Sequence, residues 1–345
     1  MRLKLPSSEQ WLYLLNVMAD RLFFRKGFHT DIKTILIVKW DEIGDMATAT
    51  HVFKLLRNDY PDADITLLCK NFVKPLVVHD PHLDHIITDI AAFNQVYDLV
   101  VELRGTYSTL WRSIRYMAQY RTSRAEIRFK NKGRQLHEIA TNTAVAASVT
   151  RAANKDQKPV LYYSETEKNN VANFLNNAGI KRYAVLHAGA RRVLRQWPPD
   201  RFAAIALFLK ETFELDIVFA GTEDEEAQIN HIRQMTAFPT HLFTRGFSLS
   251  EFACLCSGAA VFVGNESGPL HIASSFGIPL IGLYGPGVPD VFYPTGDNSR
   301  VLHHVLRCNP CNQIDCVVPE NPCIQRIMVL DVCNELLNLK DKINL

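Results

Sequence analysis

The sequence predicts an α/β protein with two domains, each built on a parallel β-sheet. Short apolar runs rich in β-branched residues alternate with helical or turn-rich stretches, which is the pattern of βαβ units. A first set of these runs lies at residues 34–40, 63–70, 85–90 and 97–103. A second set starts at Tyr183, Leu215, Ala260 and Pro279, and each of its runs ends in a glycine-bearing loop. Strands that are covered on both faces of a parallel sheet have this continuous apolar character.

Chain length and local composition predict where the domains lie. The chain has 345 residues, of which 47% are hydrophobic, so it can bury two cores. Residues 154–159 are polar and end in proline, as a linker does. We expect an N-terminal extension over residues 1–30, a first domain over 31–158, a linker over 159–182 and a second domain over 183–345. Within the first domain, residues 107–149 are expected to form helices and loops.

The composition excludes several classes of protein. Lys plus Arg total 38 and Asp plus Glu total 36, so no overall positive field favours a nucleic-acid partner. No apolar segment is long enough to span a bilayer. Because the N-terminus lacks the pattern of a secretory signal, we expect a cytoplasmic protein whose eight cysteines are free thiols.

Residues 11–24 are predicted to form an amphipathic helix. Its apolar stripe consists of Trp11, Leu14, Leu15, Met18 and Leu22. Positive charges near its end come from Arg21, Arg25 and Lys26. Two interpretations stay open. The helix packs on the first domain, or it lies on an anionic membrane surface as a peripheral contact.

The loop that follows the apolar run at residues 261–263 carries the strongest functional signal. Gly264 and Asn265 lead into Glu266, Ser267 and Gly268, and a helix that contains His271 follows. Ser267 precedes a proline, which fits the chemistry of a helix start. Backbone N–H groups at such a start can bind a diphosphate, and Gly268 lets a phosphate approach closely. A plain strand-to-helix turn is the alternative interpretation.

This segment resembles the xGNDSGPxHxAxxxGxPxxxLxGP string of the ADP-heptose:lipopolysaccharide heptosyltransferase family, glycosyltransferase family 9. The matching positions are Gly264, Asn265, Ser267, Gly268, Pro269, His271, Ala273, Gly277, Pro279, Leu283, Gly285 and Pro286. One departure is Glu266, where the family usually has aspartate. The side chain keeps its negative charge but moves it outward by one methylene. The resemblance assigns Glu266, Ser267, Gly268 and His271 to the sugar-nucleotide donor.

Two further loops of the second domain resemble the same family. LHAGARRVLRQWPP resembles the HPGA loop, with Gly189 and Ala190 as backbone donors and Arg195 in place of the usual lysine. An arginine can bind a phosphate through two hydrogen bonds. Trp197 is interpreted as a packing residue, with stacking on a nucleotide as the alternative.

The third loop, FAGTEDEEAQI, contains a run of four acidic residues from Glu223 to Glu226. A carboxylate just after a strand can accept hydrogen bonds from ribose hydroxyls, and we assign Glu223 to this role. The simpler interpretation is that the run complements the dipole at a helix N-terminus.

In the first domain, the segment that includes Gly44 and Asp45 resembles the opening IGD motif of the family. There the aspartate is the proposed general base, which takes a proton from the attacking sugar hydroxyl. Gly44 permits close approach of the acceptor at the turn. A helix N-cap is the alternative role for Asp45. His51 stands where the family often has proline, so the geometry of this helix is expected to differ slightly.

A basic run lies between residues 112 and 134. It comprises Arg112, Arg115, Arg121, Arg124, Arg128, Lys130, Lys132 and Arg134, against the single acid Glu126. We expect Arg121, Arg124 and Arg128 to bind an anionic glycolipid acceptor. A solvated surface without a ligand is the alternative.

Four cysteines crowd together near the C-terminus. Cys308, Cys311, Cys316 and Cys323 have the spacing C-x2-C-x4-C-x6-C, which is compatible with a structural zinc ion or an iron–sulfur cluster. The chemistry of the resembled family requires no metal, so any metal here is expected to be structural rather than catalytic.

The resemblance extends from residue 35 to about residue 327. It implies the GT-B fold, in which two Rossmann-like domains face an interdomain cleft, the first binding the acceptor and the second the donor. The implied reaction is inverting, metal-independent transfer of heptose or a related sugar from a nucleoside diphosphate, by analogy ADP-heptose, to a lipopolysaccharide-core or similar anionic glycan. The resemblance also implies that the protein acts in the cytoplasm, including the cytoplasmic face of the inner membrane. Two alternatives stay open: another sugar-nucleotide enzyme such as an epimerase, and a non-catalytic protein that binds nucleotide sugars.

Overall fold

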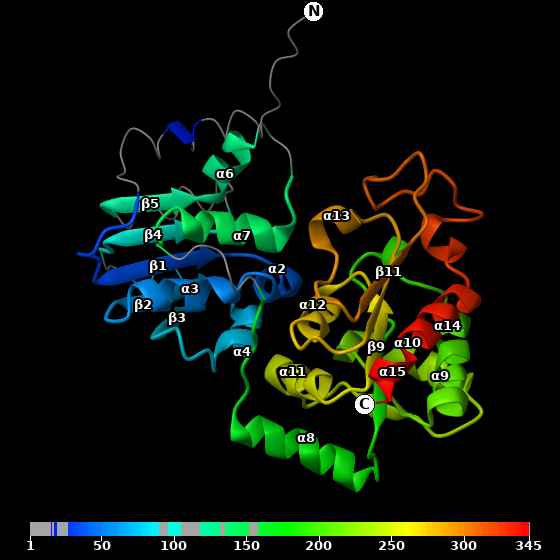
Figure 1. Ribbon diagram of the computed structural model, residues 1–345. Helices are drawn as coiled ribbons and strands as arrows, with labels where there is room; N and C mark the ends of the chain where they lie inside the picture. The colour runs from blue at the N-terminus through cyan, green and yellow to red at the C-terminus, as the bar shows by residue number, and fades with distance from the viewer. Residues whose placement is uncertain are drawn as a thin grey trace, which may run out of the picture. The chain divides into compact units, whose positions relative to one another are not determined.

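The computed structural model describes residues 15, 17, 18, 27–89, 96–104, 118–131, 135–151 and 158–344 (Figure 1). The chain divides into two compact units, Met1–Val160 and Leu161–Leu345. Almost all of the predicted N-terminal helix lies outside the described residues. None of the helices in the described part of the chain is both long enough and apolar enough to cross a lipid bilayer.

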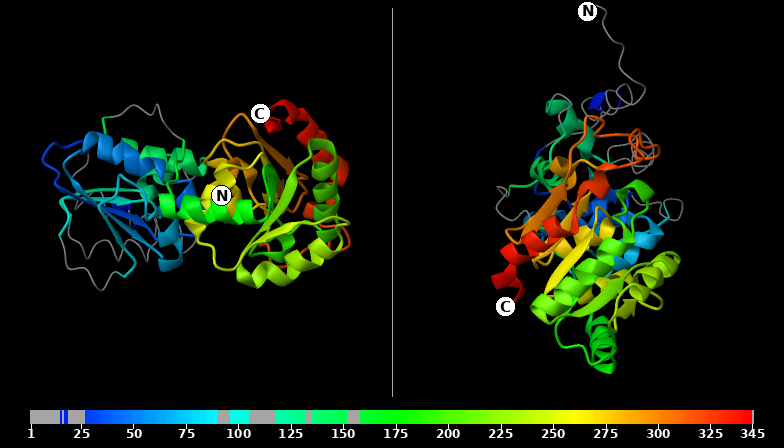
Figure 2. Two further views of the ribbon diagram at one scale, coloured as in Figure 1. Left: turned by 90° about the horizontal axis from the view of Figure 1, so that it is seen from below. Right: turned by 90° about the vertical axis from the view of Figure 1, so that its right-hand side faces the viewer.

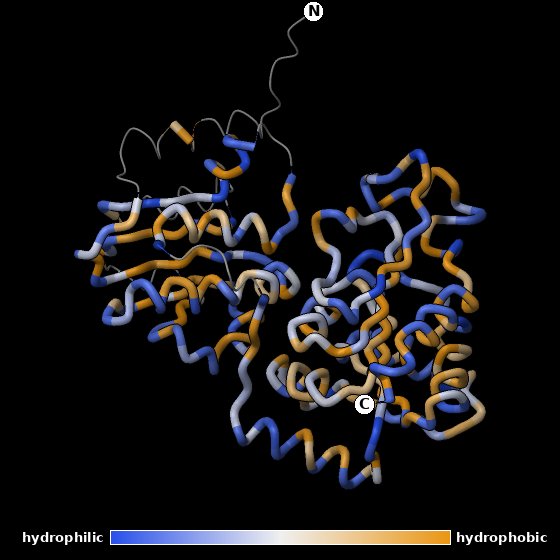
Figure 3. The backbone as a smooth tube through the Cα atoms, in the orientation of Figure 1, coloured by the Kyte–Doolittle hydropathy of each residue, from blue (hydrophilic) through white to orange (hydrophobic). Residues whose placement is uncertain are grey.

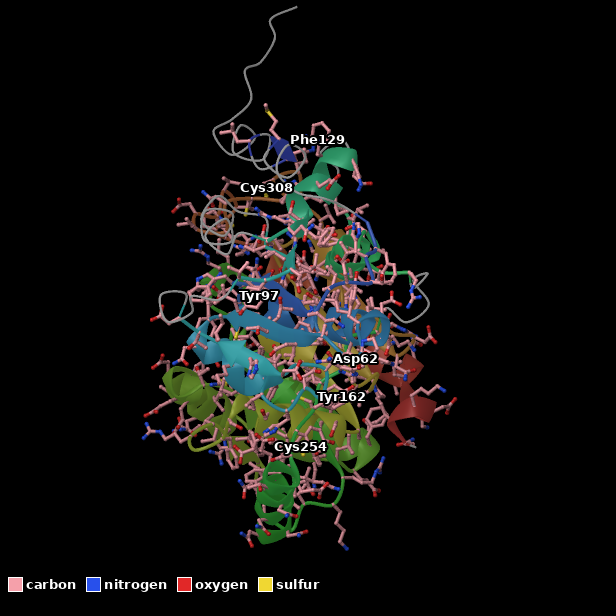
Figure 4. The ribbon with its side chains drawn as sticks, turned by 90° about the vertical axis from the view of Figure 1, so that its left-hand side faces the viewer. Asp62, Tyr97, Phe129, Tyr162, Cys254 and Cys308 are labelled. Carbon is pink, nitrogen blue, oxygen red and sulfur yellow. The ribbon has the colours of Figure 1, made fainter. Side chains whose placement is uncertain are left out.

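The first unit is built on a five-stranded parallel sheet with the strand order β3-β2-β1-β4-β5. Its strands are β1 (Thr34–Lys39), β2 (Asp64–Cys69), β3 (His85–Ile87), β4 (Leu99–Glu102) and β5 (Tyr120–Ser123). The central strand β1 is apolar because both of its faces are covered, and Ile35 to Val38 are fully buried. Tyr97, labelled in Figure 4, belongs to the core at the start of β4.

Helices connect these strands and cover the sheet. They are α2 (Ile43–Ala47), α3 (His51–Asp59), the 3₁₀ turn η1 (Asn71–Val73), α4 (Lys74–Val77), α6 (Arg124–Lys130) and α7 (Glu138–Ala147). Helix α7 contacts α3, α6, β4 and β5. His51, where the resembled family often has proline, begins α3, is buried and forms a hydrogen-bonding pair with Thr143 of α7 at 2.9 Å.

The second unit is built on a six-stranded parallel sheet with the strand order β11-β10-β9-β6-β7-β8. Its strands are β6 (Tyr183–His187), β7 (Asp216–Ala220), β8 (His241–Phe243), β9 (Val261–Asn265), β10 (Leu280–Tyr284) and β11 (Ser299–His303). Figure 3 shows that the strands of both sheets are mostly hydrophobic. The sequence-based prediction of two parallel-sheet α/β domains is therefore confirmed.

Helices cover both faces of the second sheet, so this unit has three layers (Figures 1 and 2). One face carries α9 (Pro199–Phe213), α10 (Glu226–Gln234) and α14 (Val329–Asn338), which share a core with the strands. The other carries α11 (Leu249–Ser257) and α12 (Gly268–Ser274). The remaining elements are α8 (Glu165–Asn177), η2 (Val193–Arg195), η3 (Glu223–Glu225), α13 (Pro289–Phe292), η4 (Cys323–Arg326) and α15 (Lys340–Ile343).

Two sequence-based expectations need correction. Residues 107–149 were expected to lack strands, yet they contain β5. Strands β8 and β11 were also missed. All three are edge strands with polar or charged residues, so they lack the apolar run that marks a central strand.

The second correction concerns residues 159–182, which were expected to form a linker. They contain α8, where Asn170 donates a hydrogen bond to Glu251 of α11 at 2.8 Å. Helix α8 is therefore packed on the second unit.

Candidate functional site

The carboxyl ends of β7, β6 and β9 lie side by side in the second sheet, because these strands are neighbours and parallel. The loops that follow them are the three that the sequence singles out. His187, the last residue of β6, is in register with Gly264 of β9. Ligands of open parallel sheets bind beyond this edge.

Asn265 joins the loop after β6 to the loop after β9. Its side chain is fully buried, donates a hydrogen bond to the carbonyl of Ala188 at 2.7 Å and accepts one from the backbone N–H of Trp197 at 3.0 Å. A buried amide that is satisfied on both sides holds its neighbours in one arrangement. The amide of Asn265 thus positions the predicted Gly189–Ala190 backbone next to the loop after β9.

Trp197 is a packing residue. Its ring is fully buried, contacts Phe202 edge to face at 5.3 Å between centroids, and donates a hydrogen bond to the carbonyl of Ile327 at 2.8 Å. These contacts confirm the packing interpretation, because a buried ring cannot stack on a nucleotide.

Arg195 and Glu266, both predicted to contact the donor, form an ion pair. Arg195 Nη1 lies 3.3 Å from Glu266 Oε1, and Arg195 Nε donates a hydrogen bond to Gln313 at 2.7 Å. Burial raises the pKa of Glu266 to about 7, and Arg195 only partly offsets this effect. Gly287 makes room for the carboxylate, because a Cβ at that position would overlap Glu266.

Ser267 and Gly268 stand where the sequence predicts them, at the start of α12. Ser267 is the extended N-cap residue, and its hydroxyl donates a hydrogen bond to the carbonyl of Asn265 at 3.1 Å. Helix α12 is short, so its dipole alone does not make a strong anion site. His271 lies within the helix, largely buried, rather than at the loop.

The acidic run after β7 divides into an exposed and an inward-facing part. The side chain of Glu223 is 67% exposed and lies 3.3 Å from Arg245. Glu225 instead lies 3.6 Å from His187 Nε2. Sequence reasoning missed Glu225 and His187. The spacing from Thr222 to Glu225 predicts a capping box but says nothing of a contact with another strand.

In the first unit, Asp45 lies in the first turn of α2, next to Gly44. The N-cap residue of α2 is Glu42, so the alternative interpretation of Asp45 as an N-cap is wrong. The side chain is half-buried, and burial raises the pKa of its carboxyl group. Lys39 opposes this shift and Glu138 adds to it. A carboxylate with a raised pKa is a stronger base.

Asp45 borders a buried ionic network that sequence reasoning missed. Lys39 Nζ lies 3.1 Å from Glu138 Oε1 and 3.2 Å from Asp41 Oδ2, and all three side chains are almost completely buried. Arg124 completes a two-pronged contact with Glu138, in which Nη2 donates to Oε2 at 2.6 Å. The sequence feature that could have indicated this network is Lys39, a lysine at the end of the otherwise apolar strand β1.

The residues of the basic run differ in their burial and in their partners. Arg121 was expected on an acceptor-binding surface, but it lies on β5 and is only 1% exposed, so the surface interpretation is wrong for this residue. Arg124 and Arg128 lie on α6 and are half-buried. Lys130 pairs with Glu126 at 3.3 Å. Arg112, Arg115, Lys132 and Arg134 lie outside the described residues.

The four clustered cysteines line one cavity of about 20 Å³. Cys308 is labelled in Figure 4. All eight cysteines of the chain are free thiols. In the residues that the structure describes, no three His, Cys, Asp or Glu side chains converge closely enough to hold a metal ion.

The chain resembles known proteins over most of its length. The profile of glycosyltransferase family 9 (heptosyltransferase) matches residues 95–321, well over half of the chain. A putative glycosyltransferase of Haemophilus influenzae is 23% identical over 317 residues, which cover 82% of this chain and 88% of the relative.

Two solved structures share the fold. One is a family 9 glycosyl transferase from Veillonella parvula, with a TM-score of 0.77, 18% identity, and coverage of 91% of this chain and 98% of that chain. The other is the ADP-heptose lps heptosyltransferase II of E. coli, with a TM-score of 0.68, 20% identity, and coverage of 89% and 98%. These likenesses confirm the GT-B fold class. With its two parallel-sheet units and its family match, the chain belongs to glycosyltransferase family 9, the heptosyltransferases, and is a glycosyltransferase.

Proposed function

We propose that this glycosyltransferase moves heptose or a related sugar from ADP-heptose to a sugar of the lipopolysaccharide core or a similar anionic glycan. The observation that carries the proposal is the set of contacts between the loops after β6 and β9 at one edge of the second sheet. Asn265 bonds to Ala188, Arg195 pairs with Glu266, and Ser267 lies next to His187. These loops are the ones that resemble the donor-binding motifs of the family.

The donor would bind at this edge. Arg195 and the backbone donors of Gly189, Ala190, Ser267 and Gly268 would hold the diphosphate, since guanidinium and N–H groups are the usual partners of phosphate oxygens. Exposed Glu223 would accept hydrogen bonds from ribose hydroxyls. Glu266 would contact the sugar, and we assign His271 a supporting role within α12 because it is buried behind the loop.

The acceptor would bind to the first unit. Arg128 on α6 would attract its negative charge. Arg124 on the same helix, which also pairs with Glu138, would add to the positive field, and Gly44 would leave room beside Asp45. The acceptor hydroxyl oxygen attacks the anomeric carbon, the bond from that carbon to the diphosphate oxygen breaks, and Asp45 takes the hydroxyl proton. One displacement of this kind inverts the anomeric centre, and the positive groups around the diphosphate stabilise it as it leaves. No step needs a metal ion. We place the reaction at the cytoplasmic face of the inner membrane, where a glycolipid acceptor meets a nucleotide sugar.

A donor screen tests this proposal. Purified protein is incubated with ADP-heptose and other nucleotide sugars in the presence of extracted lipopolysaccharide core, and products are followed by mass spectrometry. We expect release of ADP together with a mass increase of one heptose on the core. A product that forms without acceptor would favour the epimerase. Donor binding without turnover on any acceptor would favour a non-catalytic protein.

A further inference from the structure

The three most exposed large hydrophobic side chains in the described part of the chain lie around one small cavity of the second unit. They are Val193, Val317 and Val305, which are 76%, 73% and 71% exposed. The cavity of about 20 Å³ is lined by Val317 itself and by Leu194 and Leu306, the chain neighbours of the other two valines. A single exposed aliphatic residue is ordinary, but a group of them around one point marks an interaction surface.

A fourth exposed aliphatic residue, Ile314, belongs to the same surface and is 64% exposed. Its neighbour Gln313 accepts a hydrogen bond from Arg195 Nε at 2.7 Å, which joins the loop between β11 and η4 to η2. In Figure 1 this loop is orange and extends beyond the end of β11. We call the four exposed residues around the cavity the apolar rim: Val193, Val305, Ile314 and Val317.

Arginines accompany the apolar rim. Arg192 and Arg307 lie in the two segments that carry it, residues 191–193 and 304–320, and both are exposed. In the residues that the structure describes, neither guanidinium takes part in an ion pair. Together with Arg191, the two segments hold three exposed arginines against two exposed acids, Asp315 and Glu320. The surface therefore combines apolar side chains with a small excess of positive charge.

The apolar rim lies at the same edge of the second sheet as the proposed donor site. The loops that carry it follow β6 and β11, which run parallel in one sheet, so both loops begin at its carboxyl edge. The acceptor of the proposed reaction is a glycolipid, whose hydrophobic part lies in a bilayer. A membrane-binding surface at this edge would hold the donor unit close to the layer in which the acceptor sugar lies.

We propose that the apolar rim binds the surface of an anionic lipid bilayer. Its four aliphatic side chains enter the headgroup region, and Arg192 and Arg307 lie beside lipid phosphates. Apolar insertion and attraction to anionic lipids are the two contributions that hold peripheral proteins on a membrane. The purpose of this surface rests on the proposed function, whereas its binding to lipid can be measured without any sugar donor. The surface is separate in the sequence from the helix expected over residues 11–24.

The central test is flotation of the full-length protein with vesicles of phosphatidylcholine, alone or mixed with phosphatidylglycerol. We expect native protein to float with the mixed vesicles, and its binding to weaken as salt is added. Val305→Ser/Val317→Ser should lower the partition coefficient for mixed vesicles by about tenfold or more. The matched control is Val96→Ser/Leu330→Ser, which replaces two residues that are each 68% exposed and lie outside the apolar rim. The control should bind as the native protein does.

Arg307→Gln tests the electrostatic part of the binding. Loss of one arginine should lower the partition coefficient about fivefold at low salt and have little effect at high salt. Scanning fluorimetry should give a native Tm for each variant, because the replaced side chains are exposed. If the double valine variant does not fold, Val305→Ser and Ile314→Ser decide as single variants.

A transfer assay separates a lipid-binding surface from a part of the catalytic site. Val305→Ser/Val317→Ser should keep the native Kd for ADP and the native rate with a deacylated core acceptor. With the acylated acceptor in mixed vesicles, its rate should fall by a factor close to the loss of vesicle binding. An equal fall with both acceptors would overturn the membrane role.

The remaining outcomes are also distinguishable. Native protein that does not bind the mixed vesicles, a double valine variant that binds like the native protein, or an equal loss in the matched control overturns the membrane role. A native dimer that dissociates in the double variant, with vesicle binding unchanged, would assign the apolar rim to a contact between two copies of this chain instead. Vesicle binding that is lost only in the double variant supports the surface even where no sugar is transferred, and in that case the proposed function alone fails.

Discussion

Arg195 lies 3.3 Å from Glu266, a carboxylate that is only 4% exposed. The two residues are 71 positions apart in the chain and reach one another from the loops after β6 and β9. An ion pair usually lowers the pKa of its acid, but here burial is the larger effect and the pKa of Glu266 rises to about 7. The protein therefore keeps a carboxyl group at the proposed donor site that titrates near neutrality.

The first prediction concerns the pH dependence of stability at Glu266. Its folded-state pKa of about 7 lies above the ordinary value of 4.5, so the folded protein holds this proton more tightly than the unfolded chain does. The stabilisation from Glu266 is therefore complete below about pH 4.5 and is lost as the pH rises through 7. We expect the free energy of unfolding of the native protein, relative to Glu266→Gln, to fall by on the order of 3 kcal/mol from pH 4.5 to 8. Urea denaturation of both proteins across this range measures the difference. A difference that does not change with pH would contradict the prediction.

The second prediction concerns Asp45, the proposed general base. Asp45→Asn keeps the size of the side chain but cannot accept the proton, so turnover should fall by roughly 10² to 10⁴. Affinity for ADP and Tm should stay close to native values, because Asp45 is not the N-cap of α2 and lies in the unit without the proposed donor loops. Steady-state rates together with ADP calorimetry test this. A near-normal rate in the folded variant would remove Asp45 from the mechanism.

The third prediction is the pH profile of the reaction. A general base works only when it is deprotonated, and burial raises the pKa of Asp45 above the ordinary 3.8, with Lys39 opposing and Glu138 adding to the shift. The acidic limb of kcat/KM should therefore fall at a pH above that of an ordinary aspartate. Rates are measured from pH 4 to pH 8 over a range in which the protein stays folded. A profile that stays flat down to the ordinary value would speak against a half-buried base.

The fourth prediction concerns Glu138 in the buried network. Burial acts to raise the pKa of Glu138, but Lys39 and Arg124 outweigh it and lower this pKa to about 2. Glu138 therefore stabilises the fold above the ordinary value of 4.5, and this contribution is lost as the pH falls towards 2. Glu138→Gln removes one of the two carboxylate partners of the buried Lys39 and the carboxylate that pairs with Arg124, so we expect it to destabilise the protein by about 3 to 5 kcal/mol at pH 7. The loss should shrink at pH 3. Urea denaturation at both pH values measures it, and an equal loss at the two would count against the ionic origin.

The fifth prediction concerns the cysteine cavity. Burial raises the pKa of the Cys323 thiol, whereas metal ligands must be thiolates, and no group of three ligand-type side chains in the described residues is arranged to hold a metal ion. Protein purified without chelator should carry zinc and iron far below one equivalent per chain. Elemental analysis by mass spectrometry measures this, with Cys308→Ser as a reference for background metal. One full equivalent that disappears in the variant would establish a structural metal site.

Local features of the sequence determined the central part of this fold. The apolar runs at β1, β2, β6, β7, β9 and β10 mark buried strands because a strand covered on both faces must be apolar throughout its length. The glycine- and serine-bearing loop around Ser267 marked the proposed phosphate contact for a similar local reason, since its chemistry is contained within six consecutive residues. The match of these segments to one family then followed from the sequence as well.

The tertiary structure decided the features that depend on which distant segments meet. The basic residues between 112 and 134 look alike in the sequence, yet β5 buries Arg121 and α6 turns Arg124 towards Glu138. Glu223 and Glu225 are equivalent in an acidic run, yet only Glu225 reaches His187, because strand order places β7 next to β6. Composition and spacing describe each segment by itself, whereas the burial and pairing of a charged side chain depend on the neighbours that the sheet brings to it.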